Sequence, residues 1–272
     1  MIRIGTKILW ISYRSVVTPN WDQYLPLVPD RKVGNEGEDS PQAAFADLRS
    51  HLRQLELPQI VHGRRAIILI EGPQGAGKKH ALRQIAAAFD PCHFAVHNIS
   101  YDRRQSAEGH WLARFWRALP GAGRTSIFFR SWYRRVLDDR ILGRTDDAAL
   151  TRAFDEINEF EAQQRDYGTL IVKLYFDVSA EMQERRLEER ASNPWQSVVR
   201  NDDLISVREP GYRRAFDDLK MHTDTRWSPW KFIDGNDENE AAVSALAAIA
   251  DAWEKAMPAE PPRLVSTPDQ AA

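Results

Sequence analysis

Cysteine is almost absent from this chain of 272 residues, in which Cys92 is the only one. A single cysteine excludes an internal disulfide and a metal site built from thiolates, and it is typical of proteins kept in a reducing compartment. We therefore expect Cys92 to be a small core residue. Long apolar runs are also missing, since the apolar stretch within MIRIGTKILWIS at the start is too short for a signal core or a membrane span. These absences predict a cytoplasmic protein with no membrane partner.

The chain also lacks an excess of either charge. Its 37 basic and 39 acidic residues give a formal net charge of −2. This balance argues against general binding of nucleic acid or of a membrane surface, and no nucleic-acid-binding motif is present. Any anion-binding site must therefore be local.

Composition and punctuation indicate one main domain with appendages. Hydrophobic residues make up 43% of the chain, enough to bury a substantial core. A stretch rich in proline, aspartate and glycine from Pro26 to Pro41 separates an N-terminal extension, residues 1–42, from the domain at 43–256. Residues 257–272 have the composition of a disordered tail.

Apolar strands alternate with helical segments throughout the main domain. This alternation predicts an α/β fold, a doubly wound parallel sheet with helices on both faces. The expected strands are one that ends at Glu71, followed by His93 to Ile99, Thr125 to Phe129, Leu170 to Val178, and Trp230 to Ile233.

One apolar stripe at helical spacing precedes the third expected strand. It consists of Leu112, Phe115, Trp116 and Leu119, and Pro120 ends it. Such stripes usually pack a helix on a sheet, so we expect these aromatic side chains in the core.

The most informative segment is AIILIEGPQGAGKK, residues 66–79, in which Gly72 and Gly77-Lys78 have the spacing of a phosphate-binding loop. The backbone N–H groups of such a loop point at an anion, the next helix offers its positive end, and the lysine reaches the outer phosphates. The hydroxyl that usually follows this lysine and holds magnesium is missing, because Lys79 occupies its position. The predicted phosphate-binding residues are Gly72, Gln74, Gly75, Gly77, Lys78 and Lys79.

The alternative is that this segment is only a glycine-rich turn between a strand and a helix. Its setting favours the phosphate loop, because Ile67 to Ile70 form a buried parallel-type strand and Leu82, Ile85, Ala86 and Phe89 follow at helical spacing.

Arginine is dense between Arg103 and Arg144. Guanidinium groups suit phosphate oxygens, but most of these arginines are also explained as solvated helix faces balanced by Asp138, Asp139, Asp146 and Asp147. Arg130 differs because it directly follows the strand that ends at Phe129. The carboxyl ends of parallel strands form the ligand crevice, so Lys78 and Arg130 should face the same ligand.

The string WLARFWRALPGAGRTSIFFRSWYRRVL, residues 111–137, closely resembles the type 2 polyphosphate kinases, whose second motif is a strand ending in FDRSWY. The resemblance extends from Ala43 to Trp253 and includes Phe160-Glu161, KLYFDVS at 173–179 and TDTRWSPW at 223–230. It implies a three-layer P-loop kinase fold with a helical lid at about 181–220. It also implies phosphoryl transfer between inorganic polyphosphate and a nucleotide, with Mg2+ as cofactor.

Residue by residue, the resemblance assigns catalytic roles to three cations, Lys78, Arg114 and Arg130. The family's carboxylates are not carried over, because Gln74 and Phe129 stand where it has aspartates, and Ser106 stands where it has an acid. The basic run expected in the lid is also missing from residues 195–199. In fused two-copy members of the family one copy is similarly degenerate, with FF in place of FD.

These losses leave two hypotheses open. In the first, the chain is a divergent phosphotransferase with impaired catalysis, and Glu71 or Asp102 holds the metal, with Glu108 a further substitute. In the second, the chain is a catalytically inactive regulatory module that binds polyphosphate or nucleoside phosphates. Such a module acts as a sensor, as a homo-oligomer or as the partner of an active homologue.

Overall fold

The computed structural model describes residues 41–99, 109–193 and 210–260. Compactness divides the chain into residues 1–38 and 39–272, and every described residue belongs to the second unit. The candidate acids Asp102 and Glu108, together with Ser106 and the lid segment 194–209, lie outside the described residues. The same holds for most of the predicted N-terminal extension and tail.

A five-stranded sheet forms the centre of the domain, with the strand order β2-β3-β1-β4-β5. All neighbouring strands are parallel. The strands are β1 (Arg65–Glu71), β2 (Phe94–Asn98), β3 (Thr125–Phe129), β4 (Thr169–Asp177) and β5 (Trp230–Asp234). The predicted parallel α/β sheet is confirmed, and the expected strand positions agree to within about one residue at each end.

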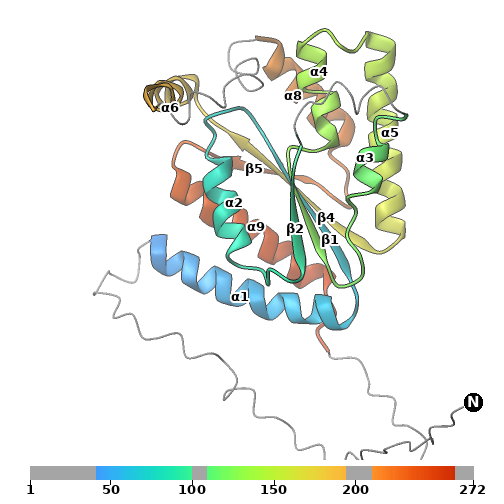
Figure 1. The fold of residues 1–272 in the computed structure, drawn as a ribbon, viewed down its shortest axis with the longest axis vertical. Helices are drawn as coiled ribbons and strands as arrows, with labels where there is room; N and C mark the ends of the chain where they lie inside the picture. The colour runs from blue at the N-terminus through green and yellow to red at the C-terminus, as the bar shows by residue number, and fades with distance from the viewer. Residues whose placement is uncertain (1–40, 100–108, 194–209, 261–272) are drawn as a thin grey trace, which may run out of the picture. The chain divides into compact units, whose positions relative to one another are not determined.

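Helices cover both faces of this sheet, which gives the predicted three layers (Figure 1). One face carries α1 (Pro41–Val61), α2 (Lys78–Ala86) and α9 (Glu238–Ala256). The other carries α3 (Ala113–Trp116), the 3-10 turn η2 (Trp132–Arg135), α4 (Asp138–Ile141), α5 (Asp147–Asp166) and α8 (Pro210–Thr223). The helix α6 (Ala180–Ser192) follows β4 and, with α8, flanks the undescribed part of the predicted lid.

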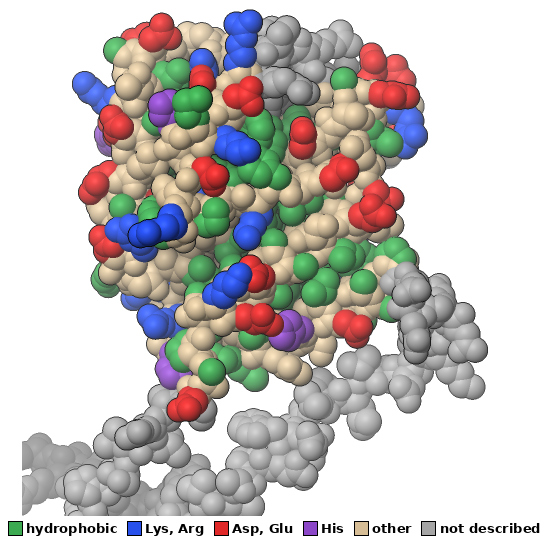
Figure 2. Space-filling view, turned by 180° about the vertical axis from the view of Figure 1, so that it is seen from behind, with side chains coloured by type: hydrophobic (Ala, Val, Ile, Leu, Met, Phe, Trp, Pro, Cys, Tyr) green, Lys and Arg blue, Asp and Glu red, His purple; other side chains and the backbone are tan. Residues whose placement is uncertain are grey.

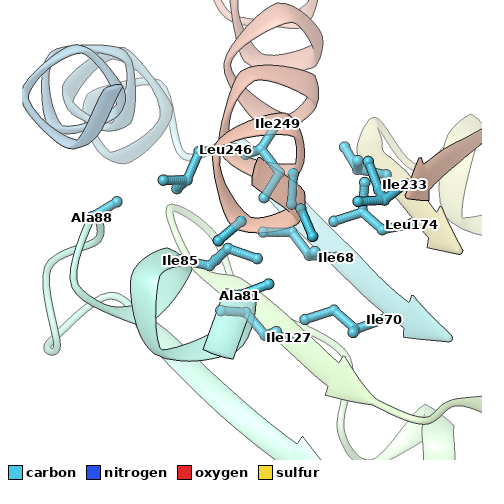
Figure 3. Close-up of a cluster of buried hydrophobic side chains, with 14 of the residues drawn as sticks. Ile68, Ile70, Ala81, Ile85, Ala88, Ile127, Leu174, Ile233, Leu246 and Ile249 are labelled. Atoms are coloured by element: carbon cyan, nitrogen blue, oxygen red, sulfur yellow. The ribbon is translucent and has the colours of Figure 1, made fainter. Parts of the chain in front are cut away.

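The alternating side chains of β1 build both halves of the core. Ile68 and Ile70 pack with Ala81 and Ile85 of α2 and with side chains of α9 (Figure 3). Ile67 and Leu69 point to the opposite face, among the aromatic residues of η2 and α5. A strand covered on both faces must be apolar throughout, which explains the uninterrupted apolar run in the sequence.

Two sequence-based expectations about the core are wrong. Cys92 is exposed, in the turn between α2 and β2, where its backbone N–H donates to Asp90 Oδ1 at 2.9 Å. Trp116, the last residue of α3, is 47% exposed, and this helix is a single turn that does not extend across the whole predicted stripe. One edge of the Trp116 ring still packs against Phe160, with the ring centroids 4.9 Å apart.

No helix among the described residues is long and apolar enough to cross a membrane. On the face in Figure 2, basic and acidic side chains are interspersed, in keeping with the balanced charge of the sequence.

Candidate functional site

The glycine-rich segment joins the end of β1 to the start of α2. Gly77 precedes the first residue of α2 with φ of 76°, and Gly75 has φ of 80°, both in the left-handed region that favours glycine. At Gly72 the backbone of β4 leaves no room for a side chain, since a Cβ atom would lie 2.1 Å from the carbonyl oxygen of Phe176. The glycines therefore let the chain turn tightly from β1 into α2 while it lies against the backbone of β4.

Lys78 lies inside this loop. Its ammonium donates to the carbonyl oxygens of Gly72 at 2.7 Å and Pro73 at 2.5 Å, and the residue is 6% exposed. The charge is thus held within the curve of the loop and at the positive end of α2, where phosphate oxygens are favoured. Lys79 is exposed on α2, and Gln74 is 8% exposed within the loop.

Helix α6 contacts the loop through two side chains, Arg186 and Gln183, to which no sequence motif points. Arg186 donates to the carbonyl oxygens of Gly75 and Gly235, both at 2.6 Å, and to that of Asn236 at 2.6 Å. Gln183 donates to the carbonyl oxygen of Gln74 at 2.8 Å. The first helix of the predicted lid is therefore tied to the phosphate loop and to the turn after β5.

The second motif begins at the neighbouring strand end. Arg130 follows β3 directly and has φ of 65°, the only non-glycine residue with positive φ among the described residues. A left-handed conformation costs a non-glycine residue about 1 to 2 kcal/mol, and such strain is typical of functional sites. The Arg130 N–H donates to the carbonyl oxygen of Ile70 at 3.1 Å, which fixes the start of the motif beside the loop.

Glu71, a candidate metal ligand, connects the two motifs. Its Oε1 accepts hydrogen bonds from the Ser131 N–H at 2.6 Å and from the Ser131 hydroxyl at 2.7 Å. Burial raises the pKa of Glu71 to about 7, and the hydrogen bonds from Ser131 oppose this rise. One oxygen of this carboxylate is thus committed to holding Ser131 in place.

The structure adds one acid to this region, Asp138, which the sequence predicts to be only a balancing surface charge. Its Oδ2 pairs with Arg134 Nε at 3.0 Å. Burial raises the pKa of Asp138, while the nearby charges of Arg134, Arg130 and Lys78 lower it. Lys78 and Arg130 therefore act on the same carboxylate, which indicates that both cations lie in one region. Nothing in the linear spacing of Asp138 points to this position.

Three further arginines of the dense segment have carboxylate partners. Arg135 and Arg144 pair with Asp139, each at 3.6 Å, and Arg140 pairs with Asp218 at 2.5 Å. The simpler explanation, charge balance on helix faces, fits these residues. Arg114 lies on α3, with its guanidinium carbon 4.8 Å from the centroid of the Phe115 ring.

Of the positions that depart from the expected carboxylates, Gln74 and Phe129 lie among the described residues. Phe129 is 7% exposed and belongs to the apolar core formed with α2 and α9. Within the described residues no group of three or more His, Cys, Asp or Glu side chains could hold a metal ion. Glu71 is bonded to Ser131 through one oxygen, and Asp138 is paired with Arg134.

A buried ion pair holds the residues of the second motif that follow Arg130. Lys173 of β4 and Glu161 of α5 are both fully buried and 3.1 Å apart. Glu161 Oε1 accepts from Trp132 Nε1 at 2.9 Å and from the Tyr133 hydroxyl at 2.7 Å. Lys173 also donates to the carbonyl oxygen of Thr223, at the end of α8, at 2.7 Å. The segments quoted for the family resemblance therefore meet in one network, which positions the residues after Arg130.

Comparison with known proteins assigns this architecture to a family. The family model described as Polyphosphate kinase 2 matches residues 35–261. A polyphosphate:AMP phosphotransferase of Pseudomonas syringae pv. tomato is 36% identical over 192 residues, which is 70% of this chain and 39% of that protein. An ADP-polyphosphate phosphotransferase 3 of Rhizobium meliloti is 30% identical over 207 residues, covering 75% of this chain and 73% of that protein.

Solved structures agree with this assignment. A putative polyphosphate kinase 2 from Pseudomonas aeruginosa superposes with a TM-score of 0.76 at 31% identity, over 81% of this chain and 48% of the other. A polyphosphate kinase 2 from Arthrobacter aurescens shares the fold, with a TM-score of 0.76 at 23% identity over 87% of this chain and 88% of the other. The chain spans about two fifths of the length of the P. syringae relative, 39%.

Proposed function

Because this chain belongs to the polyphosphate kinase 2 family, we propose that it moves phosphoryl groups between inorganic polyphosphate and a nucleotide, with impaired catalysis. The observation that supports this most strongly is the juxtaposition of the phosphate loop, Lys78 and Arg130 at the carboxyl edge of the sheet. Relatives are named for AMP, ADP and GDP, so the proposed acceptors are nucleoside mono- and diphosphates.

In this proposal the chain's own residues act by positioning and by neutralising charge. The amides of residues 72–77 and Lys78 hold phosphate oxygens, Arg130 contributes a second cation, and Arg114 is a third candidate. Phosphoryl transfer depends mainly on such electrostatic stabilisation, and Mg2+, when bound by the phosphates, would supply further positive charge. Asp138 pairs with Arg134 and lies within the influence of the charges of Arg130 and Lys78, so it would help to position this cationic region.

The proposed impairment rests on Gln74 and Phe129. Loss of one preorganised electrostatic group costs about 3 to 4 kcal/mol, or roughly 100- to 1000-fold in rate. Phe129 belongs to the apolar core and cannot hold a metal or orient a nucleophile. The described residues offer no cluster of acids in compensation.

The second candidate function is binding without turnover, as a regulatory pseudo-kinase. It is favoured by the same loss of carboxylates, because fewer negative charges in a cationic pocket favour an anionic ligand. In this form the chain would be a sensor, a homo-oligomer or the partner of an active homologue, in the cytoplasm.

An assay of acceptors separates the two candidates. Protein free of other kinases is incubated with polyphosphate and each nucleoside mono- and diphosphate, with Mg2+ or Mn2+, while polyphosphate binding is measured in parallel. Slow product formation that Arg130→Gln reduces further supports the divergent enzyme. Tight binding with no product supports the regulatory module. Absence of binding contradicts both.

A further inference from the structure

The amino edge of the sheet, opposite the phosphate loop, contains a cavity that the proposed function does not use. Its volume is about 190 Å³, and its wall includes Arg64, Arg65, Arg165, Thr169 and Trp227. Arg65 and Thr169 are the first residues of β1 and β4 and pair directly in the sheet. The phosphate loop follows the other end of β1, about 20 Å away for a strand of this length.

The strand register explains why this hollow exists. The first pair between β4 and β5 is Lys173 with Trp230, so the β4 residues 169–172 extend beyond the start of β5. Trp227 precedes β5 and lines the space, and Ser228 donates to the carbonyl oxygen of Ile171 at 2.9 Å. The cavity therefore lies where a longer β5 would continue the sheet.

Three guanidinium groups give this cavity its charge. The guanidinium carbon of Arg65 lies 4.5 Å from the Tyr167 ring centroid, and that of Arg165 lies 5.0 Å from the Trp227 ring centroid. Stacking on a ring covers one face of a guanidinium and leaves its edge donors available for an oxyanion. Arg165 pairs with Asp166 at 2.7 Å, whereas Arg64 and Arg65 form no ion pair within the described residues.

A buried polar group in the wall also lacks a partner. Thr169 is 6% exposed, and its hydroxyl has no hydrogen-bond partner among the described residues. Buried hydroxyl groups are nearly always hydrogen-bonded, so Thr169 is a residue of the cavity wall whose hydroxyl lacks its usual partner.

From these features we propose that the cavity binds a small phosphate oxyanion: free phosphate, pyrophosphate or the end of a polyphosphate chain. Three arginines line the cavity, and one of them, Arg165, pairs with Asp166. The cavity therefore has a net positive charge, which matches a multiply charged anion. The volume of about 190 Å³ is below the roughly 300 to 1,000 Å³ typical of sites for drug-sized ligands, which argues against a whole nucleotide. The carboxyl ends of α5 and α9 border the cavity and disfavour an anion, so binding must depend on the guanidinium groups.

Calorimetric titration of the full chain with tripolyphosphate at low salt tests this site. Two classes of site are expected in the parent, because the phosphate loop and the cavity are separate. Lys78→Ala should weaken one class and leave the other. The double variant Arg64→Gln with Arg65→Gln should do the reverse, and weaken the cavity site at least tenfold.

The matched control is Arg83→Gln with Arg152→Gln, which removes the same charge from exposed positions on α2 and α5 and should leave both classes unchanged. Arg64 is exposed, so Arg64→Gln alone retains the fold if the double variant unfolds, and it should still weaken the cavity site.

Competition identifies the ligand, since phosphate and pyrophosphate displace tripolyphosphate from a site for free anions, whereas only long polyphosphate does so at a chain-end site. The inference is wrong if Lys78→Ala protein binds no anion, or if the arginine variants bind like the control. Neither result bears on transfer by the parent, which tests the proposed function separately.

Discussion

Glu71 should make the stability of this domain depend on pH in a way that one substitution removes. Burial raises the pKa of this carboxyl from 4.5 to about 7 in the folded protein. At about 1.4 kcal/mol for each pH unit, this rise corresponds to about 3 kcal/mol. Between pH 4.5 and 7 the folded state retains the proton and the unfolded state releases it. The contribution of Glu71 is therefore fully present below pH 4.5, is lost as the pH rises to about 7, and is flat above that.

The substitution Glu71→Gln retains an oxygen that can accept from Ser131 and removes the titration. Urea unfolding of parent and variant at steps from pH 4 to pH 8 gives the difference in the free energy of unfolding at each pH. This difference should change by about 3 kcal/mol in favour of the variant as the pH rises, because only the parent has a carboxyl to ionise. Glu159→Gln, at an exposed position on α5, is the control for loss of one glutamate. Parallel curves for the parent and Glu71→Gln would show that Glu71 does not bind a proton on folding.

Three further changes test the loop and its supports. Gly72→Ala should destabilise the fold by more than about 2 kcal/mol in urea unfolding, since its Cβ would lie 2.1 Å from a β4 carbonyl oxygen, whereas Gly143→Ala meets no atom within 4 Å and should cost only about 1 to 2 kcal/mol. Arg186→Gln should weaken polyphosphate binding several-fold in calorimetry, because the loop loses its bond to α6; unchanged affinity would exclude that role. Lys173→Met should cost about 3 to 5 kcal/mol by leaving Glu161 buried and unpaired, and adding Glu161→Leu should recover much of this, which thermal unfolding can check.

The fold could be predicted from the sequence because its signals are local. Uninterrupted apolar strands that alternate with helical segments leave few topologies, and the run at Ile67 to Ile70 shows directly that both faces of β1 are covered. The exposure of Trp116 could not be predicted, because a stripe at helical spacing does not reveal that the helix is a single turn ending at this residue.

The candidate site could be predicted only in part. The phosphate loop follows from glycine spacing, and Arg130 from its position after a strand. Arg186 could not be found in this way, because it reaches the loop through contacts between elements distant in the sequence. Asp138 could not be found either, because its charge pattern fits an exposed helix face and its burial is not encoded in the spacing. The role of Glu71 is likewise set by its hydrogen bonds to Ser131, which no spacing encodes.

The most direct test of the central claim is the rate of phosphate transfer from polyphosphate to a nucleotide acceptor, measured for the parent and for Lys78→Ala. The account predicts transfer at least roughly 100-fold below the 1 to 100 per second typical of kinases, and its loss in Lys78→Ala. A parent rate within that range would contradict the proposed impairment. A residual rate that Lys78→Ala leaves unchanged would contradict the assignment of the site to the phosphate loop.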